Sequence, residues 1–207
     1  MFAIVILVGG DGTRVSSLTK GKTKPELELY KNKKIIDFQI EAVAGLNKKI
    51  ILLSRSKFRT LNSYILQKYK NLKIEIFTEE EKLGTAGCLY PLSKLNYKFY
   101  LVVYGDLIFN IDFKKLIKFH KKKNADCTLV VHPNNHPIDS DCIEIDKNFK
   151  SKKIFFKPHL KKNIPNLCLA GISVINKKTL LLIKKKQFQD FLKNFLKLNE
   201  KKIKIFG

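Results

Sequence analysis

The fold is decided by residues 2–14, which read FAIVILVGGDGTR. Residues 2–8 are almost wholly apolar and rich in Ile and Val, and Gly9 and Gly10 end the run. A short apolar run that stops at glycines is typical of a strand buried on both faces of a parallel sheet. We therefore expect the chain to begin with a central strand that leads into a glycine-rich loop.

This loop, residues 9–14 (GGDGTR), has three glycines in four positions, followed by Thr13 and Arg14. Glycine lets backbone N–H groups approach a polyanion closely and adopts positive φ at little cost. The loop lacks the third glycine of G-x-G-x-x-G, where Val15 stands, and it lacks the Walker pattern. We interpret it as a phosphate-binding loop. The alternative is a plain turn after a strand, which seldom needs three glycines.

Outward from this loop, strand-like and helix-like segments alternate. Such alternation predicts an α/β fold, with a Rossmann-like, mixed but mainly parallel sheet flanked by helices and with ligands at the carboxyl ends of its strands. Strands are expected at residues 2–8, 49–54, 73–78 and 98–104, and helices at residues 36–44, 58–69 and 86–92.

The second half of the chain is expected to add antiparallel strands to this sheet. A helix at residues 112–123 comes before four strand-like segments, and the apolar spacing of residues 177–198 predicts one long helix. The strand-like segments are residues 126–132, 142–146, 152–157 and 167–175, with a last strand at residues 202–206.

The composition is globular, with 44% hydrophobic residues, 10 Gly and 6 Pro. No apolar run approaches the roughly 20 residues that span a bilayer, and residues 2–8 lack a basic leader and a cleavage site. We therefore expect one cytoplasmic domain over residues 1–207, with no membrane partner.

The net charge of +23 is carried almost entirely by Lys, because only three of the 41 basic residues are Arg. Sequence-specific base recognition favours Arg, and the Lys residues are scattered. We interpret the excess as a solvated surface and expect no nucleic-acid partner. A basic nucleic-acid-binding protein is the alternative, whereas a positive field would also attract phosphorylated substrates.

The four cysteines and four histidines do not form a metal-binding pattern. The cysteines are far apart, with no C-x-x-C pair, and no His lies at the spacing from a Cys that zinc fingers have. We expect free thiols, and histidines at the surface or in loops, rather than a zinc site or a disulfide framework.

Lys24 precedes Pro25, ten residues beyond Arg14. Proline fixes its own φ and favours an extended conformation at the residue before it. An extended Lys24 would hold one ammonium group in place, so that Arg14 and Lys24 could flank the same triphosphate.

Four motifs in order, GGDGTR at residues 9–14, KP at 24–25, LGTAG at 83–87 and YGD at 104–106, resemble those of the sugar nucleotidylyltransferases. The resemblance covers nearly the whole chain and is greatest to the heptose or mannose 1-phosphate nucleotidyltransferases. It implies transfer of a nucleotidyl group from a nucleoside triphosphate to a sugar 1-phosphate, with release of pyrophosphate. The alternative is a relative that binds nucleotides or nucleotide sugars without catalysis.

The resemblance also implies roles for individual residues. Asp106 corresponds to the ligand of Mg²⁺, which favours one or two carboxylates together with phosphate oxygens. Arg14 and Lys24 would act on the phosphates as catalytic residues. The implied nucleotide-binding residues are Gly9, Gly10, Gly12, Thr13, Gly84 and Thr85, and the implied substrate-binding residues are Gly105, Lys157 and Gly171.

The chain departs from the family pattern in three places. Phe156 stands where many members have a sugar-binding Glu, and Leu169 replaces the Asn of an Asn-Ala-Gly motif. Family members also supply a second metal-binding Asp beyond the strand that residues 202–206 match, whereas this chain ends at Gly207. We therefore expect a domain that is truncated at its carboxyl end.

Overall fold

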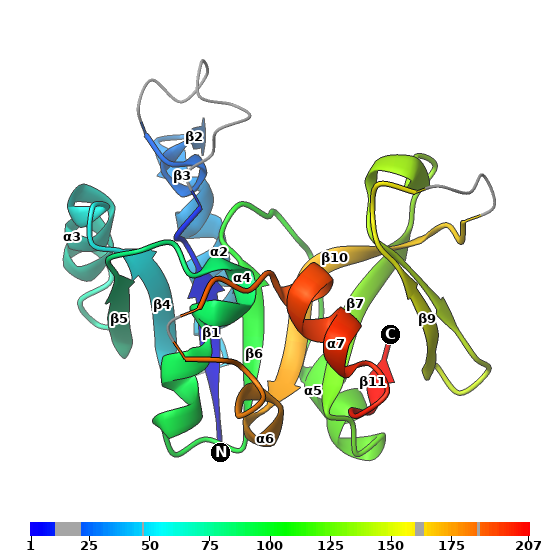
Figure 1. Ribbon diagram of the computed structural model, residues 1–207. Helices are drawn as coiled ribbons and strands as arrows, with labels where there is room; N and C mark the ends of the chain where they lie inside the picture. The colour runs from blue at the N-terminus through cyan, green and yellow to red at the C-terminus, as the bar shows by residue number, and fades with distance from the viewer. Residues whose placement is uncertain (11–21, 47, 160–163, 186) are drawn as a thin grey trace.

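The computed structural model describes residues 1–10, 22–46, 48–159, 164–185 and 187–207. Gly12, Thr13 and Arg14 lie outside the described residues. Within these ranges a mixed sheet of nine strands runs in the order β11-β7-β10-β6-β1-β4-β5, and β8 connects β10 to β9 (Figure 1). This confirms the predicted fold class.

The amino-terminal half of the sheet is parallel. β1 pairs with β4 on one side and with β6 on the other, and β4 pairs with β5. Residues 3–6 of β1 have no exposed surface, as the apolar run predicts for a central strand. The four strands are β1 (Phe2–Leu7), β4 (Ile50–Arg55), β5 (Ile74–Glu79) and β6 (Phe99–Tyr104).

Helices cover both faces of these strands. Ile4 packs in one core with Ile36 and Ile65, whereas Val5 packs in the other core with Leu89. Successive residues of one strand therefore fill two cores, and each such buried aliphatic side chain contributes about 1.5–3 kcal/mol. The elements of this half are η2 (Lys24–Glu26), the hairpin β2 (Glu28–Tyr30) and β3 (Lys33–Lys34), α2 (Ile35–Ala44), α3 (Arg59–Lys68), α4 (Gly84–Gly87) and η3 (Tyr90–Lys94).

The second half makes the sheet mixed, as expected. β10 is antiparallel to both β6 and β7, and β11 is parallel to β7. The elements are α5 (Phe113–Lys122), β7 (Cys127–Pro133), η4 (Pro137–Asp139), β8 (Cys142–Ile145), β9 (Ser151–Phe155), β10 (Leu167–Asn176), α6 (Lys177–Leu180), the π-helical η5 (Phe191–Leu196), α7 (Lys197–Asn199) and β11 (Ile205–Phe206).

The long helix predicted for residues 177–198 is wrong. α6 ends at Leu180 and η5 begins at Phe191, and the described residues between them are not helical. The backbone of Gln189 explains the break, because its N–H donates to the carbonyl of Leu83 and its carbonyl accepts the N–H of Ala86. Bonds to another segment replace those that would continue the helix.

The prediction that all histidines lie at the surface or in loops is wrong for His120. This residue is only 2% exposed, and its ring lies between Thr128 Oγ1 at 2.8 Å and Asn176 Oδ1 at 3.1 Å. Burial lowers the pKa of His120, because it disfavours the charged imidazolium. His120 is therefore a neutral core residue, held by two polar neighbours.

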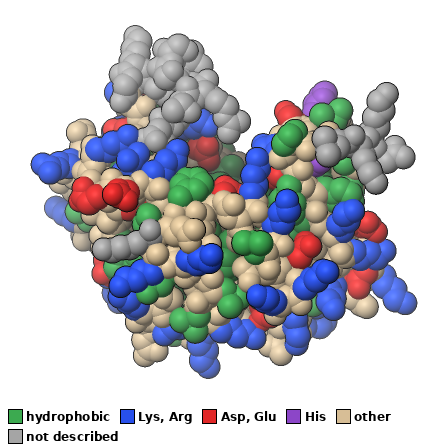
Figure 2. Space-filling model, viewed as in Figure 1, with side chains coloured by type: hydrophobic (Ala, Val, Ile, Leu, Met, Phe, Trp, Pro, Cys, Tyr) green, Lys and Arg blue, Asp and Glu red, His purple; other side chains and the backbone are tan. Residues whose placement is uncertain are grey.

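Two further features concern the length of the helices and the side chains at the surface. Among the described residues, no helix has the length and apolar character that a bilayer crossing requires. On the face drawn in Figure 2, Lys and Arg side chains are scattered among acidic and hydrophobic ones. This distribution agrees with the interpretation of the charge excess as a solvated surface.

Candidate active site

A cavity of about 380 Å³ lies at the carboxyl ends of β1 and β6. It brings together residues that the sequence places in four separate motifs. The predicted site residues that line it are Gly9, Gly10, Lys24, Gly84, Thr85, Gly105 and Asp106.

The parallel pairing of β1 and β6 aligns two of these motifs. Leu7 lies opposite Tyr104 in the register, so the loop after each strand leaves the sheet at the same edge. Gly105 donates its N–H to the Leu7 carbonyl at 2.8 Å. A Cβ at Gly105 would collide with that carbonyl and come within 2.9 Å of Val8 Cγ1. Packing against β1 thus explains Gly105, and its contact with substrate stays a prediction.

Lys24 reaches the same edge from a different segment. Its Nζ lies 3.1 Å from Oδ2 of Asp106, and both side chains are partly exposed. The expectation of an extended Lys24 is wrong, because the N–H of Leu27 donates to the Lys24 carbonyl and closes a single 3-10 turn. Buried Pro25 anchors that turn beside the cavity.

The glycines of α4 serve close backbone packing. Gly84 has a φ of +75°, and a Cβ there would come within 2.6 Å of the Gln189 carbonyl oxygen. A Cβ at Gly87 would come equally close to the carbonyl of Gln187. The N–H groups of Ala86 and Gly87 both donate to Gln189, at 2.8 and 3.2 Å. These two amides are therefore engaged within the protein, whereas Gly84 and Thr85 remain on the cavity wall.

Thr85 ties the segment before η5 to α4. Its hydroxyl donates to Oδ2 of Asp190 at 3.1 Å and accepts the N–H of Phe191 at 2.8 Å. The other carboxylate oxygen of Asp190 caps η5 by accepting from Leu192 and Lys193. Asp190 thus adds a carboxylate to the cavity wall while both of its oxygens accept hydrogen bonds from this chain.

A second cavity, of about 320 Å³, contains Lys157 and Gly171. The backbone N–H of Lys157 donates to Asp141 Oδ1, and its Nζ donates to the carbonyl of Asp139, each at 2.9 Å. Gly171 has a φ of +72°, and a Cβ there would lie 3.3 Å from the ring of Tyr104. The structure thus separates these two predicted substrate contacts from the first cavity.

Tyr104 lines both cavities, although sequence analysis quoted it in the YGD motif without giving it a role in the site. Burial raises its pKa above the ordinary 10.0, with a smaller opposing effect from a hydrogen bond with Thr85. Phe188 and Asp190 were missed. They lie in the segment for which a continuous helix was expected, so no local pattern pointed to the cavity.

The metal-binding capacity of the described residues is limited. They contain no group of three or more His, Cys, Asp or Glu side chains that could hold a metal ion. The acidic side chains on the first cavity wall are Glu79, Asp106 and Asp190. A metal ion at Asp106 would therefore need ligands from a substrate or from water.

Comparisons with known proteins agree with this arrangement. The family model described as nucleotidyl transferase matches residues 3–204. The chain is 33% identical over 178 residues to a mannose-1-phosphate guanyltransferase from Aspergillus oryzae, covering 83% of this chain and 49% of that protein. It is 31% identical over 189 residues to a putative mannose-1-phosphate guanyltransferase from Sulfolobus acidocaldarius, covering 87% and 50%. The chain spans about half the length of the curated relatives it matches.

Solved structures show the same fold. A crystal structure of HddC from Yersinia pseudotuberculosis complexed with GMP-PN superposes with a TM-score of 0.80 at 22% sequence identity. The alignment covers 100% of this chain and 89% of that one. The likeness extends over both the parallel and the antiparallel half of the sheet.

Proposed function

Because this chain belongs to the nucleotidyl transferase family, we propose that it transfers a nucleotidyl group from a nucleoside triphosphate to a sugar 1-phosphate. The observation that carries the proposal is the first cavity, where Gly9, Gly10, Lys24 and Asp106 meet at the carboxyl edge of the sheet. Open α/β sheets bind their ligands at this edge. We also infer that residues 1–207 act as one nucleotidyltransferase domain.

The reaction needs positioning more than proton transfer. A sugar 1-phosphate is anionic at neutral pH, so its oxygen attacks the α-phosphorus without a general base. The new P–O bond forms as the bond from the α-phosphorus to the bridging oxygen breaks, and pyrophosphate leaves with the electron pair. The chain's contribution is to align the two phosphates and to offset negative charge.

Lys24 is suited to offsetting the negative charge of the phosphates. Its ammonium group already lies at the cavity wall, and its exposed ion pair with Asp106 is worth at most about 1 kcal/mol. A polyphosphate would draw Lys24 away from Asp106 at little cost. Arg14, outside the described residues, is proposed to act on the same phosphates.

The donors at this edge fit Mg²⁺. The ion takes one or two carboxylates and completes its shell with water and substrate phosphate oxygens. Asp106 is 39% exposed in its side chain, and among the described residues its carboxylate pairs with Lys24 alone, whereas Asp190 is occupied as a helix cap. We therefore propose Asp106 as the magnesium ligand. When bound, the ion would offset charge on the phosphates.

The second cavity is proposed to receive the sugar 1-phosphate. Lys157 supplies an ammonium group there, and Gly171 packs closely against Tyr104 on the cavity wall. Lys157 would exchange its bond with the Asp139 carbonyl for one with the attacking phosphate. Tyr104, which lines both cavities, would then lie between the bound nucleotide and the bound sugar 1-phosphate.

For the substrates we propose GTP together with mannose 1-phosphate or a heptose 1-phosphate. The names of the relatives support guanine and mannose, and the GMP-PN complex of the neighbouring structure supports a guanine nucleotide. A cytoplasmic location would supply both substrates, and the four free cysteines agree with a reducing compartment.

The test is pyrophosphate release by the full-length protein with Mg²⁺, each common nucleoside triphosphate and a panel of sugar 1-phosphates. We expect turnover with GTP and a loss of at least about 100-fold in the Asp106→Asn variant. Nucleotide binding without turnover would instead support the non-catalytic relative. If the protein neither binds a nucleotide nor turns over substrate, the proposal is refuted.

A further inference from the structure

The carboxamide of Gln39 holds the turn that carries Asp106. Gln39 lies in α2 and is 1% exposed. Its Nε2 donates to the carbonyl of Tyr104 at 2.9 Å and to the carbonyl of Leu107 at 2.8 Å. These two carbonyls flank Gly105 and Asp106, so one nitrogen atom bridges the turn.

Among side chains of this shape, only glutamine makes both bonds. The amide nitrogen carries two hydrogens and meets two acceptors, whereas a glutamate carboxylate would offer only acceptors. Asn is one methylene shorter. The Oε1 of Gln39 is buried and has no hydrogen-bond partner among the described residues. It is therefore the two donors, not the acceptor, that match the surroundings of this side chain.

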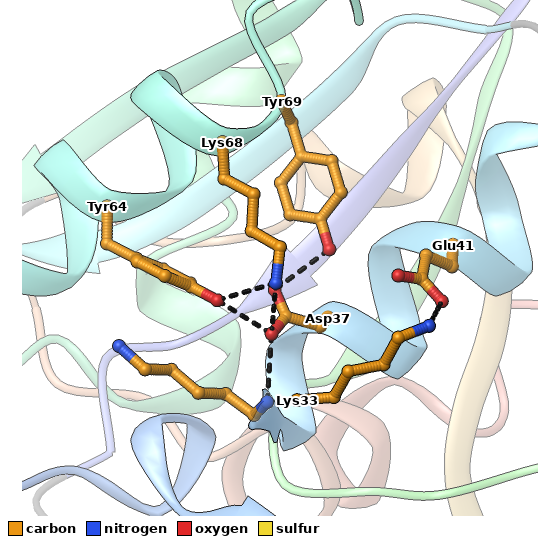
Figure 3. A network of polar contacts seen from close by, with 7 residues as sticks. Lys33, Asp37, Glu41, Tyr64, Lys68 and Tyr69 are labelled. Carbon is orange, nitrogen blue, oxygen red and sulfur yellow. Dashed lines mark hydrogen bonds and ion pairs between the residues drawn. The ribbon is translucent and has the colours of Figure 1, made fainter. Parts of the chain in front are cut away.

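The helix that presents Gln39 is anchored independently of the cavity. Asp37, two residues earlier, accepts hydrogen bonds from the hydroxyls of Tyr64 at 2.7 Å and Tyr69 at 2.8 Å (Figure 3). Lys68 adds an ion pair at 2.9 Å, and the Lys34 N–H donates to the same carboxylate. The first turn of α2 is thus fixed to α3, and Gln39 extends from a rigid support.

The turn itself has one further anchor. The N–H of Gly105 donates to the Leu7 carbonyl, which fixes the start of the turn against β1. From α2, Gln39 holds the backbone carbonyls on both sides of Asp106. The Asp106 side chain, which is 39% exposed, forms its ion pair with the partly exposed Lys24.

We propose that Gln39 is a positioning residue that sets where the Asp106 carboxylate lies at the cavity and which way it points. The inference rests on the proposed function, in which Asp106 is the magnesium ligand. Without the two donors, the Tyr104 and Leu107 carbonyls lose their partner and the turn relaxes. Asp106 then no longer presents its carboxylate at the place where a nucleotide-bound cation needs it.

The test uses Gln39→Met, which keeps the length of the side chain without donors, and Gln39→Glu, which keeps the shape with acceptors alone. Gln67→Met, on the exposed face of α3, is the matched control. Calorimetry measures the binding of Mn²⁺, as a substitute for Mg²⁺, in the presence of a non-hydrolysable guanine triphosphate. Melting temperatures identify the range in which each variant is folded.

We expect both Gln39 variants to bind Mn²⁺ about 10-fold or more weakly, as is usual when a residue that orients a metal ligand is removed. Nucleotide affinity without metal should stay within about twofold, kcat should fall, and the KM for sugar phosphate should change little. In an Asp106→Asn background, the Gln39→Met change should have no further effect on Mn²⁺ affinity, because coupled residues are not additive.

Folded Gln39→Met protein with native Mn²⁺ affinity and kcat would overturn the inference. If Gln39→Met does not fold, the same result for Gln39→Glu overturns it. Additive effects of Gln39→Met and Asp106→Asn would also overturn it. If Asp106→Asn itself leaves Mn²⁺ binding and turnover unchanged, the proposed metal ligand fails, which is a distinguishable result.

Discussion

Lys24 Nζ and Asp106 Oδ2 lie 3.1 Å apart, although 82 residues separate them in the chain. One residue comes from a 3-10 turn after the glycine loop, and the other follows the central strand β6. The ion pair places a cation and an anion together at a cavity for which we propose a polyphosphate and a divalent ion. Binding of both would separate the pair and give each side chain a new partner of opposite charge.

Replacing Lys24 should therefore impair catalysis without destabilising the fold. We expect Lys24→Gln to lower kcat/KM for the triphosphate by about 100-fold, because a charge that offsets phosphate is lost. The free energy of unfolding should change by less than about 1 kcal/mol, since the pair is exposed. Steady-state kinetics and urea unfolding measure both.

The matched control is Lys33→Gln. Lys33 forms an exposed ion pair with Glu41 at 2.7 Å, away from the residues that line the cavity. Its loss should leave turnover unchanged. Equal kinetic effects of the two substitutions would contradict a specific role for Lys24.

A methyl group at Gly105 should disrupt the cavity. The added Cβ of Gly105→Ala would collide with the Leu7 carbonyl, so β1 and β6 must shift or the turn must move. We expect a loss of about 1–3 kcal/mol of stability together with loss of turnover. Gly45→Ala is the control, because its Cβ would meet nothing within 4 Å and its φ is −62°.

Gly45→Ala should be neutral or stabilising by up to about 1 kcal/mol, through a less flexible unfolded chain. Thermal unfolding of the two variants gives the comparison. A Gly105→Ala protein as stable as Gly45→Ala would show that the approach of the two strands is not a constraint.

Removal of the Thr85 hydroxyl should loosen the segment before η5. In Thr85→Val, Asp190 Oδ2 loses a donor and the Phe191 N–H loses an acceptor. We expect about 1–3 kcal/mol of destabilisation and a higher KM for the nucleotide, since Thr85, Phe188 and Asp190 share the cavity wall. Thr60→Val, on the exposed surface of α3, controls for the change of residue type. A normal KM in a measurably destabilised Thr85→Val would confine Thr85 to a structural role.

The stability of the protein should fall in acid partly through Asp37. Burial acts to raise the pKa of Asp37, but the Lys68 ammonium, the Lys34 N–H and the tyrosine hydroxyls outweigh it and hold the pKa below 3.8. A carboxyl group with a lowered folded-state pKa stabilises the protein above its unfolded pKa. That contribution is lost as the pH falls through the folded-state value.

Asp37→Asn should therefore be less stable than the native protein at pH 7, by about 1–3 kcal/mol. The difference should begin to shrink below about pH 4, where the Asp37 carboxyl of the unfolded chain is protonated. It should disappear only below the lower folded-state pKa, where the native carboxylate is protonated as well. Urea unfolding at a series of pH values measures it. A difference that stays constant from pH 7 to the acid limit would exclude the ionised carboxylate as the cause.

Local sequence patterns were sufficient for the strands of the large sheet and for α2, α3 and α5. The helix predicted at residues 86–92 is wrong, because that segment contains the end of α4, a turn and the 3-10 helix η3. β1 and α2 follow directly from runs and spacings of Ile and Val. An element that is buried on one or two faces has apolar residues at regular, nearby positions in the sequence. The same logic failed for residues 177–198. Their apolar spacing suits a helix, yet hydrogen bonds between Gln189 and residues 83–87 hold the segment in another conformation.

The amino-acid sequence by itself determined the α/β alternation, the glycine-rich loop after β1 and the strand end that carries Asp106, since each depends on residues close together in the chain. Tertiary structure alone decided which of these meet: that Lys24 reaches Asp106, that Lys157 lies in a separate cavity, and that Gln39 supports the Asp106 turn. The contacts of Lys24 and Gln39 join residues more than 60 positions apart, and long-range pairings of single polar side chains leave no periodic pattern in a sequence.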